Sequence, residues 1–500
     1  MMHKSTITVV FLLFASALFA QTKVFKEVGE DISTQIKAIS QDNALVGYLA
    51  FTRLERANED SFNYRLTIMD ENLNDIGSVN FRQGLLDLQS VSFEHDVLCL
   101  GYIQSPIYGA RSVRNRRDLR RAQDAAASSH VLLQFINLNG KILNTYDREV
   151  ILSTATYNPR SPFSGMRLMG YLRYGMQIRN IPDGGFIVFY GDSSKQSLLT
   201  FDIRGGLTHE QILPMTADNY YLHASATEIY LLTRESSRAP LGGFKLYVYN
   251  SGNLEAENNF DLRDADGNWL KVLSFDNDPA TGDPYIAGCI VNSRRLMHPT
   301  ADDIIYRQYM GLFTLDLGNA HKEMHVNSSY WSTGRMRGVS EDGHFNDREF
   351  DVRYATAFRD YKGNTYFAGT GMVEKGYSLN GKFKLTDGVF IRQDPSGVLT
   401  VDNAIPCEES KYFGIIDLTS ELDHRNYYAV ADPDTKTSYV IVDDDQNIYI
   451  YNVSTKRVMR TIPHKDGNIK INVFPAKEGH MLVAEYNRKE KSTRFSIEAL

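Results

Sequence analysis

Cysteine is scarce in this chain, with three residues, Cys99, Cys289 and Cys407, among 500. A fold built on disulfides needs many paired cysteines, and an odd count leaves at least one thiol unpaired. Cys99 and Cys289 also stand inside the apolar runs VLCLG and AGCIV, which is typical of small buried hydrophobic side chains. The sequence therefore excludes a disulfide scaffold and predicts that these two thiols are buried.

Proline, long apolar runs and excess positive charge are also lacking. The 14 prolines are too few for a Pro-rich linker architecture. Beyond residue 20, no apolar run reaches the roughly 18 residues that a membrane-spanning helix needs. The 54 Lys and Arg against 61 Asp and Glu give a net charge of −7, which argues against nucleic acid as a partner. With 42% hydrophobic and 23% charged residues, the composition is that of a globular protein.

The first 20 residues have the order of a secretory signal peptide. Lys4 precedes the apolar stretch ITVVFLLF, and small residues follow it at 15–17. Cleavage after Ala17 or after Ala20 fits this order. We therefore expect residues 1–20 to be a signal peptide, residues 21–500 to form one domain, and the protein to be exported, into the periplasm or the medium if the source is bacterial.

Short alternating strands dominate the rest of the chain, and helical periodicity is nearly absent. The sequence is rich in Tyr (29) and Phe (26), which favour strands, and polar turns separate the alternating runs. One hairpin with a polar turn recurs seven times, at 66–81, 133–146, 198–213, 245–260, 311–326, 388–405 and 447–462. Each copy follows another pair of strands, at 36–53, 90–103, 178–193, 221–236, 272–293, 355–372 and 427–443.

An eighth pair at 471–486 is followed by only one more strand, 494–500, and we expect the N-terminal segment 22–28 to supply the missing partner. Successive pairs start 43 to 88 residues apart, and the shortest spacings match the ~40–45 residues of a propeller blade. The pattern resembles the β-propeller superfamily over the whole mature chain. This resemblance implies an all-β ring of eight four-stranded blades, with seven as the alternative, closed by the N-terminal strand. No specific family within the propellers is identified.

The longest insertions are expected at one end of this ring. If the strands of a blade are named A to D, antiparallel pairing puts the A–B and C–D turns at one end and the other connections at the opposite end. The insertions at 104–130, 147–177, 294–308, 327–350, 373–387 and 406–424 all fall in connections of the second kind. Insertions that collect on one face of a repeat protein mark its binding face, or reflect drift in tolerant loops.

These six insertions carry twenty cationic and seventeen anionic side chains, and sixteen of the cations are Arg. Arg pairs bidentately with carboxylates and phosphates, and aromatic faces beside Arg suit sugars or peptides. Read as a helix, 114–121 puts three of its arginines on one face. The predicted ligand-binding residues are Arg111, Arg114, Arg117, Arg121, Tyr171, Tyr174, Tyr330, Trp331, Arg335 and Arg337. Solvated basic loops, with aromatics packed onto the ring, are the alternative.

The sequence favours a binding protein over an enzyme. No nucleophile elbow, zinc-protease motif or phosphate loop is present, no cofactor or metal is expected, and catalytic residues stay unassigned. Asp276, Asp278 and Asp283 have the oxygens for calcium, but at the end opposite to the insertions. We expect a soluble propeller that binds a glycan or envelope component, anionic in character. The alternatives are a polysaccharide hydrolase or lyase with central carboxylates, and a scaffold of an envelope protein complex. Oligomeric state and ligand identity stay open.

Overall fold

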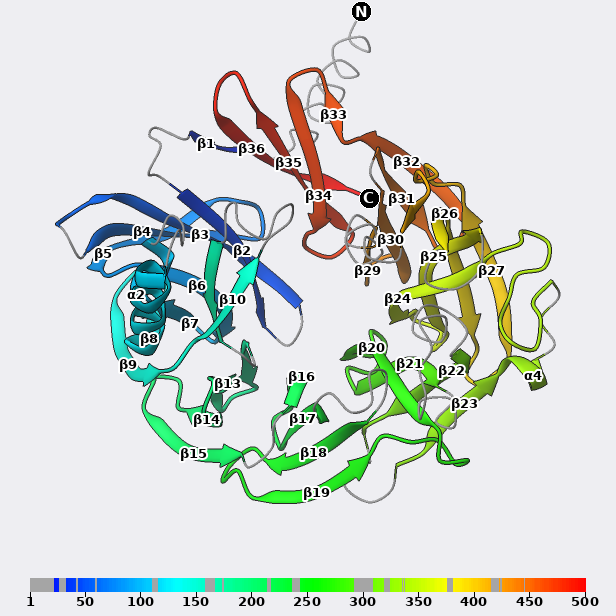
Figure 1. Cartoon of the computed structure of the whole chain (residues 1–500), viewed down its shortest axis with the longest axis horizontal. Helices are drawn as coiled ribbons and strands as arrows, with labels where there is room; N and C mark the ends of the chain where they lie inside the picture. The colour runs from blue at the N-terminus through cyan, green and yellow to red at the C-terminus, as the bar shows by residue number, and fades with distance from the viewer. Residues whose placement is uncertain are drawn as a thin grey trace, which may run out of the picture.

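In a computed structural model of the chain, eight antiparallel sheets surround a central axis (Figure 1). The structure describes residues 22–26, 33–41, 44–58, 61–109, 116–157, 167–172, 175–213, 217–235, 243–291, 309–318, 324–334, 336, 338–375, 381–414, 422, 425–444 and 446–500. The predicted signal peptide lies outside these residues. Seven of these sheets contain consecutive strands in chain order from the axis outward, as a propeller requires, and the eighth combines strands from both ends of the chain.

The first four blades follow one another from the N-terminus. From the axis outward, their strands are β2 (Ser33–Gln41), β3 (Ala44–Arg56), β4 (Phe62–Asp70) and β5 (Asp75–Gln83) in blade I; β6 (Leu86–Glu94), β7 (Val97–Gln104), β8 (Ser129–Asn137) and β9 (Ile142–Val150) in blade II; β12 (Met176–Ile181), β13 (Gly185–Gly191), β14 (Gln196–Phe201) and β15 (Leu207–Leu213) in blade III; and β16 (Ala217–Ala224), β17 (Glu228–Glu235), β18 (Phe244–Asn250) and β19 (Ala256–Asp261) in blade IV.

The next three blades repeat this order. Their strands are β20 (Trp269–Asn277), β21 (Pro284–Val291), β22 (Tyr309–Asp316) and β23 (Val326–Tyr330) in blade V; β24 (Asp351–Arg359), β25 (Thr365–Lys375), β26 (Lys382–Gln393) and β27 (Leu399–Ile405) in blade VI, where the short β28 (Phe413–Gly414) pairs with β26; and β29 (Asn426–Asp432), β30 (Thr437–Asp443), β31 (Asn447–Asn452) and β32 (Arg457–Pro463) in blade VII.

Blade VIII joins the two ends of the chain. It contains β34 (Ile469–Pro475), β35 (His480–Asn487) and β36 (Ser492–Ala499), with the short β33 (Lys465–Asp466) beside β34. Its outermost strand is β1 (Thr22–Lys26), which pairs antiparallel with β36, Val24 opposite Arg494. The predicted closure by the N-terminal segment and the count of eight blades are therefore confirmed. Closure leaves β36 without an open edge, which would otherwise be a template for aggregation.

The apolar core is divided among the interfaces between blades. One buried apolar cluster spans each of the eight neighbouring pairs, including the pair of blades VIII and I, where Tyr48 and Leu73 pack with Leu482 and Phe495. A blade alone cannot bury both faces of its sheet, so each blade is stabilised by packing against its two neighbours. The inner strands are also linked by polar contacts, such as the backbone N–H of Leu222, which donates to Gln177 Oε1 at 2.9 Å.

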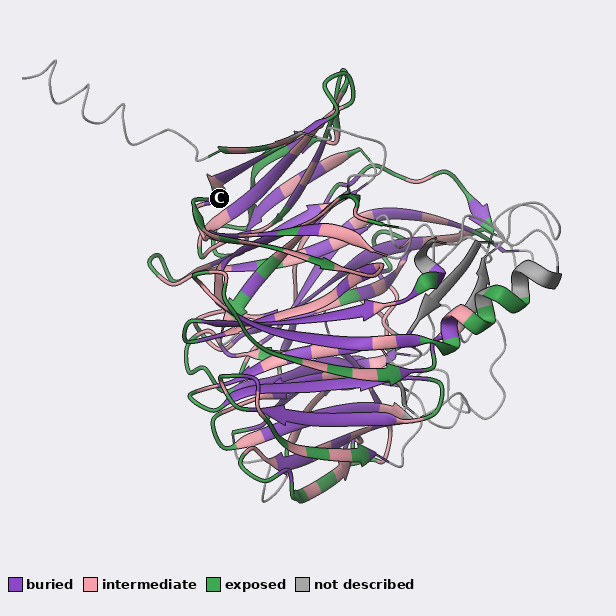
Figure 2. Cartoon of the chain, turned by 90° about the vertical axis from the view of Figure 1, so that its left-hand side faces the viewer, coloured by how far each residue is buried: buried purple, intermediate pink, exposed green. Residues whose placement is uncertain are grey.

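The two ends of the ring differ as the sequence predicts. In Figure 2 tight turns crowd one end, while the helix α2 (Arg116–Ala127) projects from the other. α2 lies in the first long insertion, after the short 3-10 helix η1 (Pro106–Gly109). The second insertion forms the hairpin of β10 (Ser153–Tyr157) and β11 (Arg167–Tyr171), and β11 contacts η1. We call this end of the ring the insertion end, and the end that carries the A–B turns the turn end.

Candidate functional site

A cavity of about 700 Å³ lies on the axis at the turn end. It forms because the inner strands of blades I and V to VIII converge there. Apolar side chains make most of its wall, among them Ile36, Leu45, Phe358, Val430 and Phe474. A concave, largely apolar cavity with a few convergent polar groups is the usual geometry of a small-molecule site. We call this cavity the axial pocket.

An ion-pair group closes one side of the axial pocket. The Arg359 guanidinium lies 3.1 Å from Asp278 Oδ2 and 2.5 Å from Asp316 Oδ1, and its Cζ stands 4.5 Å from the centre of the Tyr285 ring. Asp278 also accepts hydrogen bonds from the backbone N–H of Ala280 within its own turn. Asp278 is therefore engaged by its turn and by Arg359, and these contacts account for it without the calcium that its sequence context suggested.

Asp276, at the end of β20, stands deeper on the axis. Its side chain contacts solvent inside the pocket but is surrounded by protein on almost every side, and this loss of hydration raises its pKa. Arg179, on β12, attracts the carboxylate and partly opposes the shift. The Arg179 guanidinium itself donates to the backbone carbonyls of Leu222 and Ile178 at 3.2 and 3.3 Å. Burial lowers the pKa of Arg179 for the same reason.

His223, on β16, borders a smaller adjoining cavity of about 170 Å³ that also exposes Arg179. It is buried, with its ring 5.2 Å from that of Phe275. Burial, with a further contribution from the nearby guanidinium, lowers its pKa to about 4. His223 is therefore neutral at physiological pH. Sequence reasoning identified neither His223 nor Arg179, because each stands alone in an ordinary strand and only ring closure brings Arg179 close to His223 and to Asp276.

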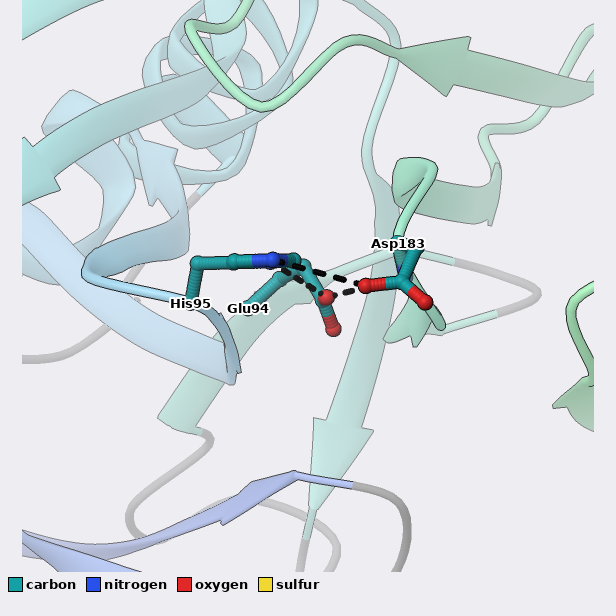
Figure 3. Close-up of side chains that lie close together, drawn as sticks. All are labelled: Glu94, His95 and Asp183. Atoms are coloured by element: carbon teal, nitrogen blue, oxygen red, sulfur yellow. Dashed lines mark hydrogen bonds and ion pairs between the residues drawn. The ribbon is translucent and has the colours of Figure 1, made fainter.

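A second cluster joins the A–B turns of blades II and III at the turn end. Figure 3 shows Glu94, His95 and Asp183, the one group of three potential metal-binding side chains that the described residues bring within 4.8 Å. Glu94 is buried, and its carboxylate accepts hydrogen bonds from Asn180 Nδ2 at 2.8 Å and from the backbone N–H of Asp183 at 3.0 Å. His95 Nδ1 lies 2.8 Å from the same carboxylate. These protein partners satisfy Glu94, so we interpret the cluster as a clamp between blades.

The predicted arginines at the insertion end are partly described. Arg117 lies in α2, although its side chain lies outside the described part of the structure. Arg111, Arg114, Arg335 and Arg337 also lie outside the described residues. Arg121 is exposed, and so is its neighbour Arg120. At the other end of α2, Ala126 is buried in the core between blades II and III, and its carbonyl accepts from the backbone N–H of Leu152 at 3.1 Å.

Two of the predicted aromatic residues, Tyr330 and Trp331, have described side chains, and both are bonded to other residues of the ring. Tyr330 donates to Asp264 Oδ2 at 2.6 Å and contacts Asp266 Oδ2 at 2.9 Å. Trp331, in the short helix α4 (Trp331–Gly334), is 4% exposed, donates from Nε1 to the carbonyl of Tyr309 and stacks on Tyr354. These contacts attach the connection between blades V and VI to the core. Tyr171 lies in β11 without a described side chain, and Tyr174 lies outside the described residues.

All three cysteines are buried and free, as expected for Cys99 and Cys289. Burial raises the pKa of Cys289 to about 12 and that of Cys407 to about 11, so both are held as unreactive thiols. Within the part of the chain that the structure describes, no helix has the length and apolar character needed to cross a membrane.

Comparison with known proteins supplies no family. No family model matches the chain, and no curated protein matches it. Among solved structures, the WD40 domain of SCAP from fission yeast is 9% identical with a TM-score of 0.41, over 96% of this chain and 98% of that one. A structure of the Dos1 propeller is 9% identical with a TM-score of 0.41, over 95% of this chain and 94% of that one.

A quinohemoprotein alcohol dehydrogenase from Pseudomonas putida is 8% identical with a TM-score of 0.42, over 95% of this chain and 78% of that one. Likenesses this remote carry no argument about activity. The fold rests on the strand order of the chain's own eight sheets and on the apolar cluster at each interface between them. The chain is therefore a β-propeller, and no specific family within that fold is identified.

Proposed function

We propose that this propeller is an exported, non-catalytic interaction protein that binds an acidic glycan at its insertion end. The observation that carries the proposal is α2, which presents exposed Arg120 and Arg121 at that end. Four of the first six residues of α2 are Arg, in the sequence RRDLRRAQDAAA. Propellers are ring-shaped repeat proteins, and such repeats offer extended surfaces for partners.

The arginines at the start of α2 do not stabilise the helix. The N-terminal end of a helix carries partial positive charge, so cations there are unfavourable by roughly 0.3–1 kcal/mol each. An anionic ligand would gain from both the guanidiniums and the helix end. No ion pair within the described residues engages Arg120 or Arg121, so these side chains are available to a ligand. A sulfate or carboxylate of a glycan is the group that Arg pairs with bidentately.

Export rests on the sequence order at 1–20, and the position of β1 supports it. β1 begins at Thr22, just after the cleavage sites at Ala17 and Ala20. Cleavage at either position would leave the ring-closing strand in the mature protein. The mature protein would then start at the outer edge of blade VIII.

Heparin, an acidic polysaccharide, tests the glycan proposal. We expect the triple variant Arg114→Ser, Arg117→Ser and Arg121→Ser to bind heparin at least tenfold more weakly near 0.15 M salt, where only close charges act strongly. The matched control removes three exposed cations in or next to C–D turns at the turn end, by Lys141→Ser, Arg204→Ser and Arg457→Ser. This control has the same net charge and should bind like the wild type.

Three outcomes would overturn the proposal. One is that the wild type does not bind heparin, and another is that both triple variants weaken binding equally. The third is that polyglutamate competes as well as heparin, because the surface would then recognise any polyanion. Thermal unfolding of all three proteins separates loss of binding from loss of the fold.

A further inference from the structure

More acidic than basic side chains line the axial pocket. Among the described residues that line it, three are acidic, Asp276, Asp278 and Glu478, and one is cationic, Arg359. That cation is already paired with Asp278 and with Asp316 outside the pocket.

Arg179 approaches Asp276 from β12, but its guanidinium donates to two backbone carbonyls. The one hydrogen bond that Asp276 accepts from the described residues comes from the backbone N–H of Asn277 at 2.8 Å. The Asp276 carboxylate and Glu478 are therefore the groups left for a ligand.

The remaining wall is apolar and partly aromatic. Phe474 is 42% exposed, an unusual fraction for a Phe, because its ring faces the cavity and not a neighbouring blade. Phe358 and Tyr361 line the same cavity, with Pro279 and Pro433. Such a wall favours the apolar body of a ligand, at roughly 25 cal/mol for each Å² of apolar surface removed from water. A small ligand fits the volume of about 700 Å³, whereas a folded partner does not.

We propose that the axial pocket binds a small organic cation, a protonated amine on an apolar or aromatic body. The amine pairs with the Asp276 carboxylate, which is exposed to the pocket, and the body lies against Phe474 and Phe358. The ammonium supplies the positive charge that the acidic wall of the pocket lacks. This site is at the opposite end from the proposed glycan surface and does not depend on it.

Two fluorescent probes with the same dansyl body test the proposal. Dansylcadaverine carries a primary amine, and dansylglycine carries a carboxylate. We expect saturable binding of dansylcadaverine with a blue shift of its emission, and binding of dansylglycine at least tenfold weaker. Asp276→Asn removes the charge with little change of shape and should weaken dansylcadaverine at least fivefold. Ala431→Phe fills the cavity and should abolish binding of both probes.

Asp183→Asn is the matched control, because Asp183 is an exposed acid at the same end that does not line the pocket. It should bind dansylcadaverine like the wild type. Equal affinity for the two probes, wild-type affinity in Asp276→Asn, or binding that survives Ala431→Phe would each overturn the proposal. Near-ultraviolet circular dichroism verifies the fold of each variant. Asp183→Asn and Asp276→Asn each remove one negative charge, so a difference between them does not come from net charge.

Discussion

Arg148 on β9 and Glu210 on β15 form a bidentate ion pair across the outer boundary of blades II and III. Arg148 Nη1 lies 2.5 Å from Glu210 Oε1, and Nη2 lies 2.8 Å from Oε2. Both side chains are about one-quarter exposed, so water screens the pair only in part. The Arg148 guanidinium, chiefly through these hydrogen bonds, holds the pKa of Glu210 below its ordinary value.

This pair predicts a pH-dependent coupling. A double-mutant cycle of Arg148→Ala and Glu210→Ala should give about 1 kcal/mol at pH 7, the upper part of the range for surface pairs. Because the pKa of Glu210 is lower in the folded state, this stabilisation is present above its unfolded value of about 4.3 and is lost as the pH falls through the folded value. Urea unfolding measures it, and a coupling that is unchanged at pH 3 would contradict the ion pair.

The lowered pKa of His223 predicts that the folding stability of the protein decreases in mild acid. Its folded pKa of about 4 lies below the ordinary 6.5, so the unfolded chain binds the proton more readily between these values. Stability should therefore fall as the pH drops from 6.5 to 4, by on the order of 2–3 kcal/mol at 1.36 kcal/mol for each pH unit. We expect His223→Phe to lose this part of the dependence. Parallel stability curves for the two proteins from pH 7 to pH 4 would show that His223 does not titrate in this way.

The burial of Trp331 predicts that its truncation lowers the free energy of unfolding. It is buried against Tyr354 with its Nε1 bonded to a backbone carbonyl, so Trp331→Ala should cost roughly 3–5 kcal/mol of unfolding free energy. Tyr330→Phe removes only a hydroxyl and its hydrogen bonds, and should cost about 1 kcal/mol. Chemical unfolding of the two variants measures the difference. If Trp331→Ala kept the stability but weakened heparin binding, Trp331 would act in ligand contact instead of packing.

Most of the architecture could be predicted from the sequence because its signals are local. Each hairpin has alternating apolar residues around a polar turn, and this pattern depends only on neighbouring residues. The eight inner pairs, the seven outer hairpins and the pairing of the N-terminal segment with β36 were all predicted from it. In the first insertion, 114–121 read as a helix puts three arginines on one face; α2 contains two of them, Arg117 and Arg121, and Arg114 lies outside the described residues.

The axial pocket was not predicted because it depends on closure of the ring. Arg179 and Asp276 stand in blades III and V, nearly a hundred residues apart, and nothing in either strand indicates the other. A usable signal does exist. Arg179, Asp276 and Arg359 all lie near the ends of inner strands, and in a propeller such positions surround one mouth of the axis. Likewise, Glu94 and Asp183 lie within the predicted strand pairs 90–103 and 178–193, but their contact across two blades was not predicted.

The pairing of β1 with β36 has a consequence for biosynthesis. β1 must wait for β36, which is synthesised more than 450 residues later, since Thr22 pairs with Ser496. Domains generally fold as units, and incomplete ones expose apolar surface that is prone to misassembly. The ring therefore closes only after residues 22–496 have all been synthesised, and until then the unfinished ring needs protection from misassembly.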